Sequence, residues 1–203
     1  MNRLAQMAVF ISGSGSNLQA IIDRCQDGTI PAKVALVVSS SPDAYGLIRA
    51  EKAGIDRVVH RRKDFSEGAA ADQQLLNLLQ SHRIDLIALA GYLKMVSPVI
   101  ISRFRGRVVN IHPGILPRYG GKGMYGLHVH EAVIANKEME TGVTVHLVDE
   151  IYDHGQILAC QKVSVQPDDT PETLAARVLE IEHALYPAVI SDLCDRILKG
   201  SLR

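Results

Sequence analysis

An amide and an imidazole stand two residues apart at the end of a short apolar run. Asn110 and His112 follow Val108 and Val109, and Pro113 ends the run. A β-branched run closed by proline and glycine is typical of a strand, and open parallel α/β sheets bind ligands at the carboxyl ends of their strands. Histidine moves protons near neutral pH, and an amide N–H stabilises a developing oxyanion. The pair therefore suits acyl or formyl transfer.

Carboxylates for the same chemistry lie further along the chain, at Asp149 and Asp153. A carboxylate beside a histidine raises its pKa and fixes its orientation. Because serine and cysteine are missing from any recognisable nucleophile setting, direct attack by a substrate amine is more natural than a covalent enzyme intermediate. Two other readings of these residues stay open: His112 as a hydrogen-bonded core histidine, and Asp153 as a turn residue before Gly155.

A glycine-rich turn separates the first apolar run, residues 7–11, from a helical pattern that begins at Leu18. Small residues such as Gly13 and Gly15 let the backbone approach a ligand closely, and a helix start presents unpaired N–H groups. The turn therefore suits a phosphate. The alternative is a plain tight turn capped by Ser16 or Asn17.

Strand and helix patterns alternate along the first 110 residues, which is typical of a doubly wound parallel sheet. Strands are predicted over residues 7–11, 33–39, 56–60, 84–90, 108–112, 142–148 and 157–165. Helices are predicted over 18–25, 42–53, 69–81 and 127–136, from 97 onward and from 170 onward, with Pro187 bending or interrupting the last one. We expect an α/β, Rossmann-like, mostly parallel sheet with helices on both faces and one antiparallel strand, at 157–165, in the second half.

The composition favours a soluble protein with small-molecule partners. The 203 residues carry 22 basic and 22 acidic side chains, which gives no overall field for nucleic acid or an anionic membrane. Three distant cysteines, Cys25, Cys160 and Cys194, argue against a disulfide framework and for the reducing cytoplasm. The chain shows neither an apolar run of about 20 residues nor a signal-peptide pattern, so we expect no membrane span.

Residues 114–126 contain five glycines and two tyrosines, which predicts a mobile loop and a candidate lid. The His128-x-His130 spacing just after this loop could indicate a metal site. A third ligand is missing, so we predict no metal. The sequence leaves the roles of His128, His130 and His146 open.

Residues 11–21, 110–113 and 153–155 together resemble the phosphoribosylglycinamide formyltransferase family of purine biosynthesis, and the likeness spans nearly the whole chain. It implies transfer of the formyl group of 10-formyltetrahydrofolate to the primary amine of glycinamide ribonucleotide through a tetrahedral intermediate, without metal. It also implies one domain over residues 1–203. Residues 1–100 would form the phosphate- and nucleotide-binding half, and residues 101–203 the catalytic and folate-binding half.

The resemblance also implies roles for individual residues. Asn110 and His112 match the catalytic pair that stabilises the oxyanion, and Asp153 matches the aspartate that keeps the histidine charged. The ribonucleotide would be bound by Gly15, Ser16 and Asn17 at its phosphate and by Glu182 near its amine. The folate would be bound by Leu93, Lys94, Met95 and Val96 together with Asn110, and the loop 149–153 would close the other side of that pocket.

Two positions depart from the family pattern. The arginine often used against the folate glutamate tail falls at Gly68, which leaves Arg61, Arg62 or Lys63 as substitutes. A basic or amide side chain often near the phosphate falls at Leu179, so more of the phosphate binding would rest on the backbone turn.

Three other functions remain as alternatives. A formyltetrahydrofolate hydrolase (deformylase) would use the same three catalytic residues with water as acceptor, and usually carries an extra regulatory domain before the first strand. A methionyl-tRNA formyltransferase would add a basic tRNA-binding domain, which we do not expect here. A non-catalytic nucleotide-binding module would need only the first turn. The oligomeric state, monomer or homodimer, is left open.

Overall fold

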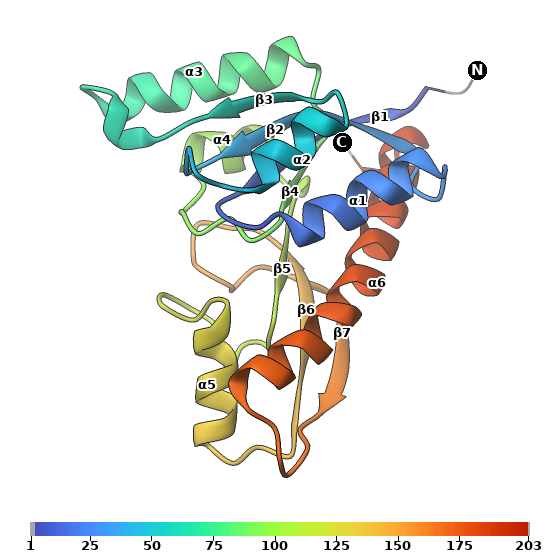
Figure 1. The fold of residues 1–203 in the computed structure, drawn as a ribbon. Coiled ribbons are helices and arrows are strands. Elements are labelled where there is room, and N and C mark those ends of the chain that lie inside the picture. The colour runs from blue at the N-terminus through green and yellow to red at the C-terminus, as the bar shows by residue number, and fades with distance from the viewer. Residues whose placement is uncertain (1–2, 203) are drawn as a thin grey trace.

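A seven-stranded sheet forms the centre of the computed structural model, which describes residues 3–202 (Figure 1). Its strands lie in the order β3-β2-β1-β4-β5-β6-β7. Their bounds are β1 (Ala5–Ile11), β2 (Ala32–Ser39), β3 (Asp56–Val59), β4 (Leu86–Leu89), β5 (Val108–His112), β6 (Glu140–Leu147) and β7 (Ile157–Ser164). All seven predicted strands are therefore present.

The first five strands pair in parallel, and β6 pairs antiparallel to both β5 and β7. The expected antiparallel strand in the second half is confirmed, but it is β6. The strand predicted as antiparallel, β7, opposes only β6 and so runs in the same direction as β5. Residues 148–156 connect β6 to β7, and because the two strands pair antiparallel this connection reverses the chain.

The helices are α1 (Ser16–Gln26), α2 (Gly46–Lys52), α3 (Gly68–Ser81), α4 (Pro98–Arg103), α5 (Leu127–Ala135) and α6 (Pro171–Leu198), with a short 3₁₀ helix, η1 (Arg62–Asp64). The helix predicted from residue 42 begins only at Gly46, because residues 41–44 form a turn in which the Ala44 N–H faces the Ser41 carbonyl. The interruption predicted at Pro187 is absent, because α6 continues through it over 28 residues. None of the helices among the described residues is long and apolar enough to cross a membrane.

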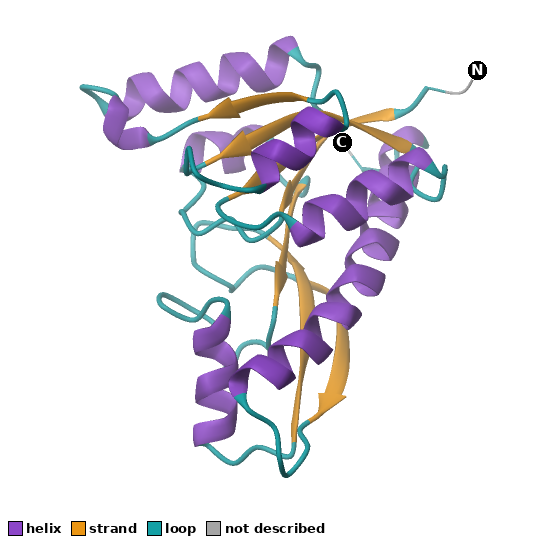
Figure 2. Cartoon of the chain, in the orientation of Figure 1, coloured by secondary structure: helices purple, strands orange, loops and turns teal. Residues whose placement is uncertain are grey.

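Alternating residues of β1 pack into two separate cores, one on each face of the sheet. Met7, Val9 and Ile11 lie in the core shared with α1, α2, α5 and α6, whereas Ala8 and Phe10 lie in the core shared with α3 and α4. A strand covered on both faces is expected to be apolar, as β1 is from Met7 to Ile11. This confirms the expected sheet with helices on both faces (Figure 2).

Helix α6 is fixed to the middle of the sheet by a tyrosine that is fully buried. The Tyr186 hydroxyl lies 2.9 Å from the Leu89 carbonyl oxygen of β4 and 3.0 Å from the Val109 carbonyl oxygen of β5. Residues four apart lie on the same face of a helix. Glu182, one turn before Tyr186, is therefore held near the carboxyl ends of β4 and β5.

Candidate active site

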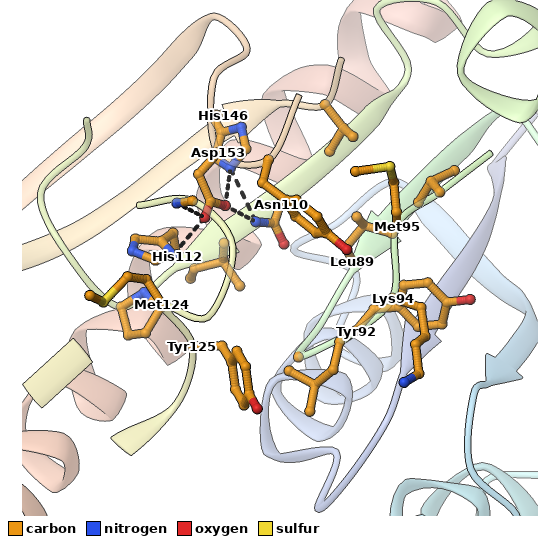
Figure 3. Close-up of a pocket in the computed structure, with 18 of the residues that line it drawn as sticks. Leu89, Tyr92, Lys94, Met95, Asn110, His112, Met124, Tyr125, His146 and Asp153 are labelled. Atoms are coloured by element: carbon orange, nitrogen blue, oxygen red, sulfur yellow. Dashed lines mark hydrogen bonds and ion pairs between the residues drawn. The ribbon is translucent and has the colours of Figure 1, made fainter. Parts of the chain in front are cut away.

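The carboxyl end of β5 lines a cavity of about 510 Å³, as its residue types predicted (Figure 3). Asn110 and His112 are two residues apart on this strand, so their side chains lie on the same face. His112 is almost fully buried, whereas Asn110 is partly exposed. The rest of the wall comes from residues 91–96, 121–126, 148–149 and 151–153, and from Asn17, Leu89, Ile111, Pro113, His146 and Glu182.

Asp153 joins this pair from 43 residues away along the chain. Its Oδ2 lies 3.7 Å from His112 Nδ1, and its Oδ1 lies 3.5 Å from Asn110 Nδ2. Asp153 adopts a left-handed backbone conformation, with φ at +53°, which aspartate tolerates better than most residues. Two residues later a Cβ on Gly155 would lie only 1.8 Å from the Leu147 carbonyl oxygen, so this loop can fold back onto β6 only with glycine there.

Both ring nitrogens of His112 face hydrogen-bond acceptors of the protein. Nε2 lies 2.6 Å from the Tyr119 carbonyl oxygen, and because a carbonyl only accepts, Nε2 carries a hydrogen. Nδ1 faces Asp153. Burial lowers the pKa of His112, and the charge of Asp153 and the Tyr119 carbonyl offset this only in part. Desolvation of the ring outweighs the carboxylate here, and the expectation that Asp153 keeps His112 charged stays a prediction.

Asp153 itself stays ionised. Burial would raise its pKa, but His146, His112 and the Gly121 backbone N–H, which donates to Oδ2 over 2.9 Å, together lower it. A carboxylate that accepts hydrogen bonds and faces imidazoles favours its charged form. The site therefore holds a fixed negative charge beside a histidine whose protonation is costly.

His146 is a member of this cluster that the sequence analysis did not assign. It is 2% exposed, and its Nε2 lies 3.1 Å from Asn110 Nδ2 and 3.5 Å from Asp153 Oδ1. The alternation of residues 142–148 places His146 on a strand, but only the pairing of β6 with β5 brings it opposite Asn110. The available signal was a histidine between the apolar Val145 and Leu147 of this strand.

The glycine-rich turn leads into α1 with an open helix start. Gly15 has φ at +69°, and among the described residues no side chain caps the N-terminus of α1. The alternative of a turn capped by Ser16 or Asn17 is therefore wrong. Asn17 instead directs its side chain across the molecule, where Nδ2 donates to Glu182 Oε2 over 2.6 Å. The first backbone N–H groups of α1 remain suited to an anion, as predicted.

Gly15 also passes closely over the start of α2. A Cβ at this position would lie 2.6 Å from the Gly46 Cα, which is shorter than real contacts allow. The Gly15→Ala variant is therefore expected to weaken binding of a phosphorylated substrate by at least about tenfold in KM, because the turn must move to accept a methyl group in a left-handed conformation. Steady-state kinetics measure this. Gly13→Ala is the matched control, since its Cβ would meet nothing within 4 Å, and equal KM values for the two variants would contradict the prediction.

Glu182 is a buried acid with an unusual titration. Burial raises the pKa of Glu182 from 4.5 to about 7, and the hydrogen bond from Asn17 opposes this only in part. The Oδ1 of Asn17 is buried without a hydrogen-bond partner in the described structure. This pair lines the cavity, and it joins the first turn of α1 to the middle of α6.

The raised pKa of Glu182 predicts a pH-dependent stability. The folded state holds the Glu182 proton more tightly than the unfolded chain, so the contribution is fully present below pH 4.5 and is lost as the pH rises to about 7. The loss is about 3 kcal/mol, from about 1.4 kcal/mol per pKa unit. Glu182→Gln should therefore become more stable relative to wild type as the pH rises from 5 to 8, measured by urea unfolding. Glu180→Gln, exposed on the same helix, should show no such trend, and a trend shared by both variants would count against this account.

The predicted folate segment lies on the cavity wall, as the resemblance implied. Leu93 and Met95 are about half exposed and Lys94 is exposed, whereas Val96 is buried in the core beneath them. The Leu93 backbone N–H donates to Ser12 Oγ over 2.8 Å, which ties this segment to the glycine-rich turn. The segment therefore offers apolar side chains and its remaining backbone groups to a ligand.

The basic cluster that could replace the missing folate-tail arginine lies elsewhere. Arg61 pairs with Asp64 and Arg62 pairs with Asp72. Among the described residues that line the cavity, these two arginines and Lys63 are absent. The guanidinium of Arg62 does cover Gly68, where a Cβ would lie 2.7 Å from Nη2. Its role toward a folate tail stays a prediction.

The glycine-rich loop contacts His112 and Asp153 instead of standing away from them. Tyr119 is buried and its hydroxyl donates to Glu138 over 2.7 Å, and Gly121 contacts Asp153. Helix α5 comes directly after this loop. His128 of α5 pairs with Glu131 at the surface. His130 of the same helix is buried, and burial lowers its pKa to about 4. Within the described residues there is no group of three or more His, Cys, Asp or Glu side chains that could hold a metal ion.

Comparison with known proteins gives one consistent result. The family model described as formyl transferase matches residues 5–190. The phosphoribosylglycinamide formyltransferase of Haemophilus influenzae is 45% identical over 187 residues, which are 92% of this chain and 86% of that protein. The enzyme of the same name from Escherichia coli is 40% identical, covering 95% of this chain and 89% of the relative.

Solved structures agree with the sequence relatives. The phosphoribosylglycinamide formyltransferase of Brucella melitensis superimposes with a TM-score of 0.86 at 41% identity, over 95% of this chain and 96% of that one. The glycinamide ribonucleotide transformylase 1 of Geobacillus kaustophilus gives a TM-score of 0.88 at 39% identity, over 95% and 100% of the two chains.

Proposed function

The chain belongs to the phosphoribosylglycinamide formyltransferase branch of the formyl transferase family, and we propose that its cavity joins 10-formyltetrahydrofolate to glycinamide ribonucleotide. One observation carries the proposal: a single cavity contains Asn110, His112 and Asp153 at one place and the Asn17–Glu182 pair beside an open helix start at another. The first set suits formyl chemistry, and the second suits a phosphorylated amine.

The ribonucleotide would lie between α1 and α6. Its phosphate would meet the backbone N–H groups of Gly15, Ser16 and Asn17, where the helix start favours negative charge. Its amine would meet the Glu182 carboxylate. The hydrogen bond from Asn17 to Glu182 supports this placement, because one residue then links the phosphate turn to the amine site.

The folate would lie along residues 91–96. The half-exposed Leu93 and Met95 offer an apolar surface to a flat ring, and the cavity volume of about 510 Å³ is within the usual range for sites of small molecules and cofactors. When bound, 10-formyltetrahydrofolate supplies the formyl group. The residues of this chain bind the two substrates and stabilise the charge that develops. Lys94 and Val96 complete that wall, with Asn110 at its inner end.

The proposed chemistry is direct attack of the substrate amine on the formyl carbon. The bond between the formyl carbon and the folate nitrogen would then break, the proton lost by the amine would pass to that nitrogen, and tetrahydrofolate would leave. Asn110 and the protonated form of His112 would stabilise the negative charge that develops on the formyl oxygen. Asp153, which stays ionised, balances the charge on His112 when the ring gains a proton. Because His112 Nε2 faces the Tyr119 carbonyl, a direct bond from Nε2 to substrate requires exchange of that contact.

The acceptor is tested by assaying purified protein with 10-formyltetrahydrofolate in the presence and absence of glycinamide ribonucleotide. The expected result is release of tetrahydrofolate that depends on the acceptor, with at least about a hundredfold lower rate without it, the discrimination expected when the amine is the positioned nucleophile. Equal rates with and without acceptor would favour the hydrolase, which uses the same Asn110, His112 and Asp153. Stoichiometric formylation of the ribonucleotide, followed by mass spectrometry, completes the test.

The enzyme acts on small molecules, and its equal numbers of acidic and basic residues offer no overall attraction for nucleic acid. We place it in the cytoplasm, because the distant and odd-numbered cysteines fit a reducing compartment.

A further inference from the structure

His146 and Asn110 are direct partners across the antiparallel pair of β5 and β6. Directly opposed residues of such a pair have neighbouring side chains on the same face of the sheet. The contact between them is a hydrogen bond, with 3.1 Å between Asn110 Nδ2 and His146 Nε2. The buried imidazole therefore decides what the partly exposed amide can do on its other side.

The other ring nitrogen of His146 is committed. Nδ1 lies 2.8 Å from the Leu147 carbonyl oxygen, and because a carbonyl can only accept, Nδ1 carries a hydrogen. Nε2 is then the only position at which this ring gains or loses a proton. Without that proton, Nε2 accepts a hydrogen bond from the Asn110 amide.

In this state the amide of Asn110 is turned the wrong way for an oxyanion. Nδ2 faces His146 Nε2 and lies 3.5 Å from Asp153 Oδ1, so its N–H groups point at the protein. The amide oxygen lies on the side away from these residues, toward the cavity (Figure 3). An oxygen accepts and cannot donate to a developing negative charge.

We propose that His146 is a positioning residue that selects which end of the Asn110 amide faces the substrate. When Nε2 holds a proton it donates to Asn110 Oδ1, so the amide turns by half a revolution and presents its NH₂ group to the cavity. When Nε2 lacks a proton, the amide presents its oxygen. The proton comes from solvent, and the step makes and breaks hydrogen bonds only. The inference rests on the proposed function, since it assigns a state to the same Asn110.

Three titratable groups surround His146, and they come from β5 and from the loop after β6. Asp153 Oδ1, 3.5 Å from Nε2, is the carboxylate that balances the added proton, and Asp149 on the same loop adds negative charge. His112 from β5 is the opposing group, because its positive form repels a second positive ring. Asp153 therefore stands between two histidines, one that faces its Oδ2 and one that faces its Oδ1.

Nuclear magnetic resonance of the unliganded wild-type protein tests the switch without any assay of turnover. The side-chain NH₂ signals of Asn110 and the ring signals of His146, His112 and, as a remote reference, His82 are followed from pH 5 to 9. The expected result is that the Asn110 NH₂ signals move with the midpoint of His146 and not with that of His112. Asn110 signals that stay unchanged while His146 titrates would overturn the proposal, and so would a His146 ring that keeps one protonation state throughout.

Two substitutions separate positioning from structure. His146→Met removes the Nε2 donor at similar size, and kcat should fall about 10- to 100-fold, the scale of a misplaced catalytic group, with KM for both substrates within about twofold. His146→Gln keeps an N–H donor at every pH, so it should recover much of kcat while the pH dependence assigned to His146 disappears. His82→Gln, on a histidine paired with Asp56 outside the cavity wall, is the matched control and should leave both unchanged.

These experiments distinguish failure of the His146 role from failure of the proposed function. A His146→Met variant with wild-type kcat, or a His146→Gln variant with the full wild-type pH profile, would overturn the role of His146 while leaving formyl transfer intact. Absence of acceptor-dependent transfer by the wild-type protein would instead overturn the proposed function. If circular dichroism shows that His146→Met does not fold, the wild-type titration and the His146→Gln profile decide.

Discussion

Replacement of His112 by alanine is expected to lower kcat by about 10²- to 10⁴-fold, the range for a positioned acid or base. The physical reason is that the ring lies beside the Asn110 amide and can carry a positive charge when the formyl oxygen gains a negative one. Its two ring nitrogens already face the Tyr119 carbonyl and Asp153, so the ring is held in one orientation. Rates at saturating substrates, measured from pH 5 to 9, give the comparison.

The control for His112 has to account for its burial. Removal of an almost fully buried ring leaves a cavity, so unfolding in urea is measured alongside kcat. His82→Ala, on the outer end of α3 beside Asp56, is the matched substitution and should retain wild-type turnover. A His112→Ala protein that folds and turns over at a near-normal rate would remove this histidine from the mechanism.

Replacement of Asn110 by alanine is expected to lower kcat by about 10²- to 10³-fold, the cost of losing one donor to an oxyanion. The effect should fall mainly on kcat, because the amide interacts more strongly with the charge that develops in the transition state than with the neutral formyl group. Single-turnover measurements with preformed enzyme and both substrates isolate that step.

Two features sharpen the Asn110 experiment. Asn77→Ala on α3, where the amide only meets Gln73 at the surface, controls for the loss of an asparagine side chain. A rise in KM for 10-formyltetrahydrofolate with kcat unchanged would assign Asn110 to folate binding alone. That result would leave the resemblance to formyltransferases intact and move the oxyanion stabilisation to His112.

The net charge of the catalytic cluster explains why its members depend on one another. Burial disfavours the charged form of His112, whereas Asp153 is kept ionised by two histidines and a backbone N–H. A negative carboxylate beside two imidazoles couples the protonation of the two rings, because the rings repel each other when both are charged. The pH dependence of turnover will therefore report the cluster and not a single residue.

Local residue types were enough to predict much of this protein. The alternation of strands and helices, the glycine-rich turn before α1, and the polar pair at the end of β5 all depend on periodicity or on conformations that neighbouring residues impose. The identity of the chemistry also came from short segments, 11–21, 110–113 and 153–155, whose likeness to formyltransferases the family match bears out.

What local patterns could not decide are the contacts between distant segments and their electrostatic consequences. Asn17 pairs with Glu182 across 165 residues, and His146 meets Asn110 only through the register of β5 and β6. The pKa of His112 falls where a neighbouring carboxylate predicted a rise, because desolvation depends on everything that packs around the ring. Residue types thus determined which chemistry is available. The tertiary structure decided which groups lie together at the site and how burial shifts their pKa values.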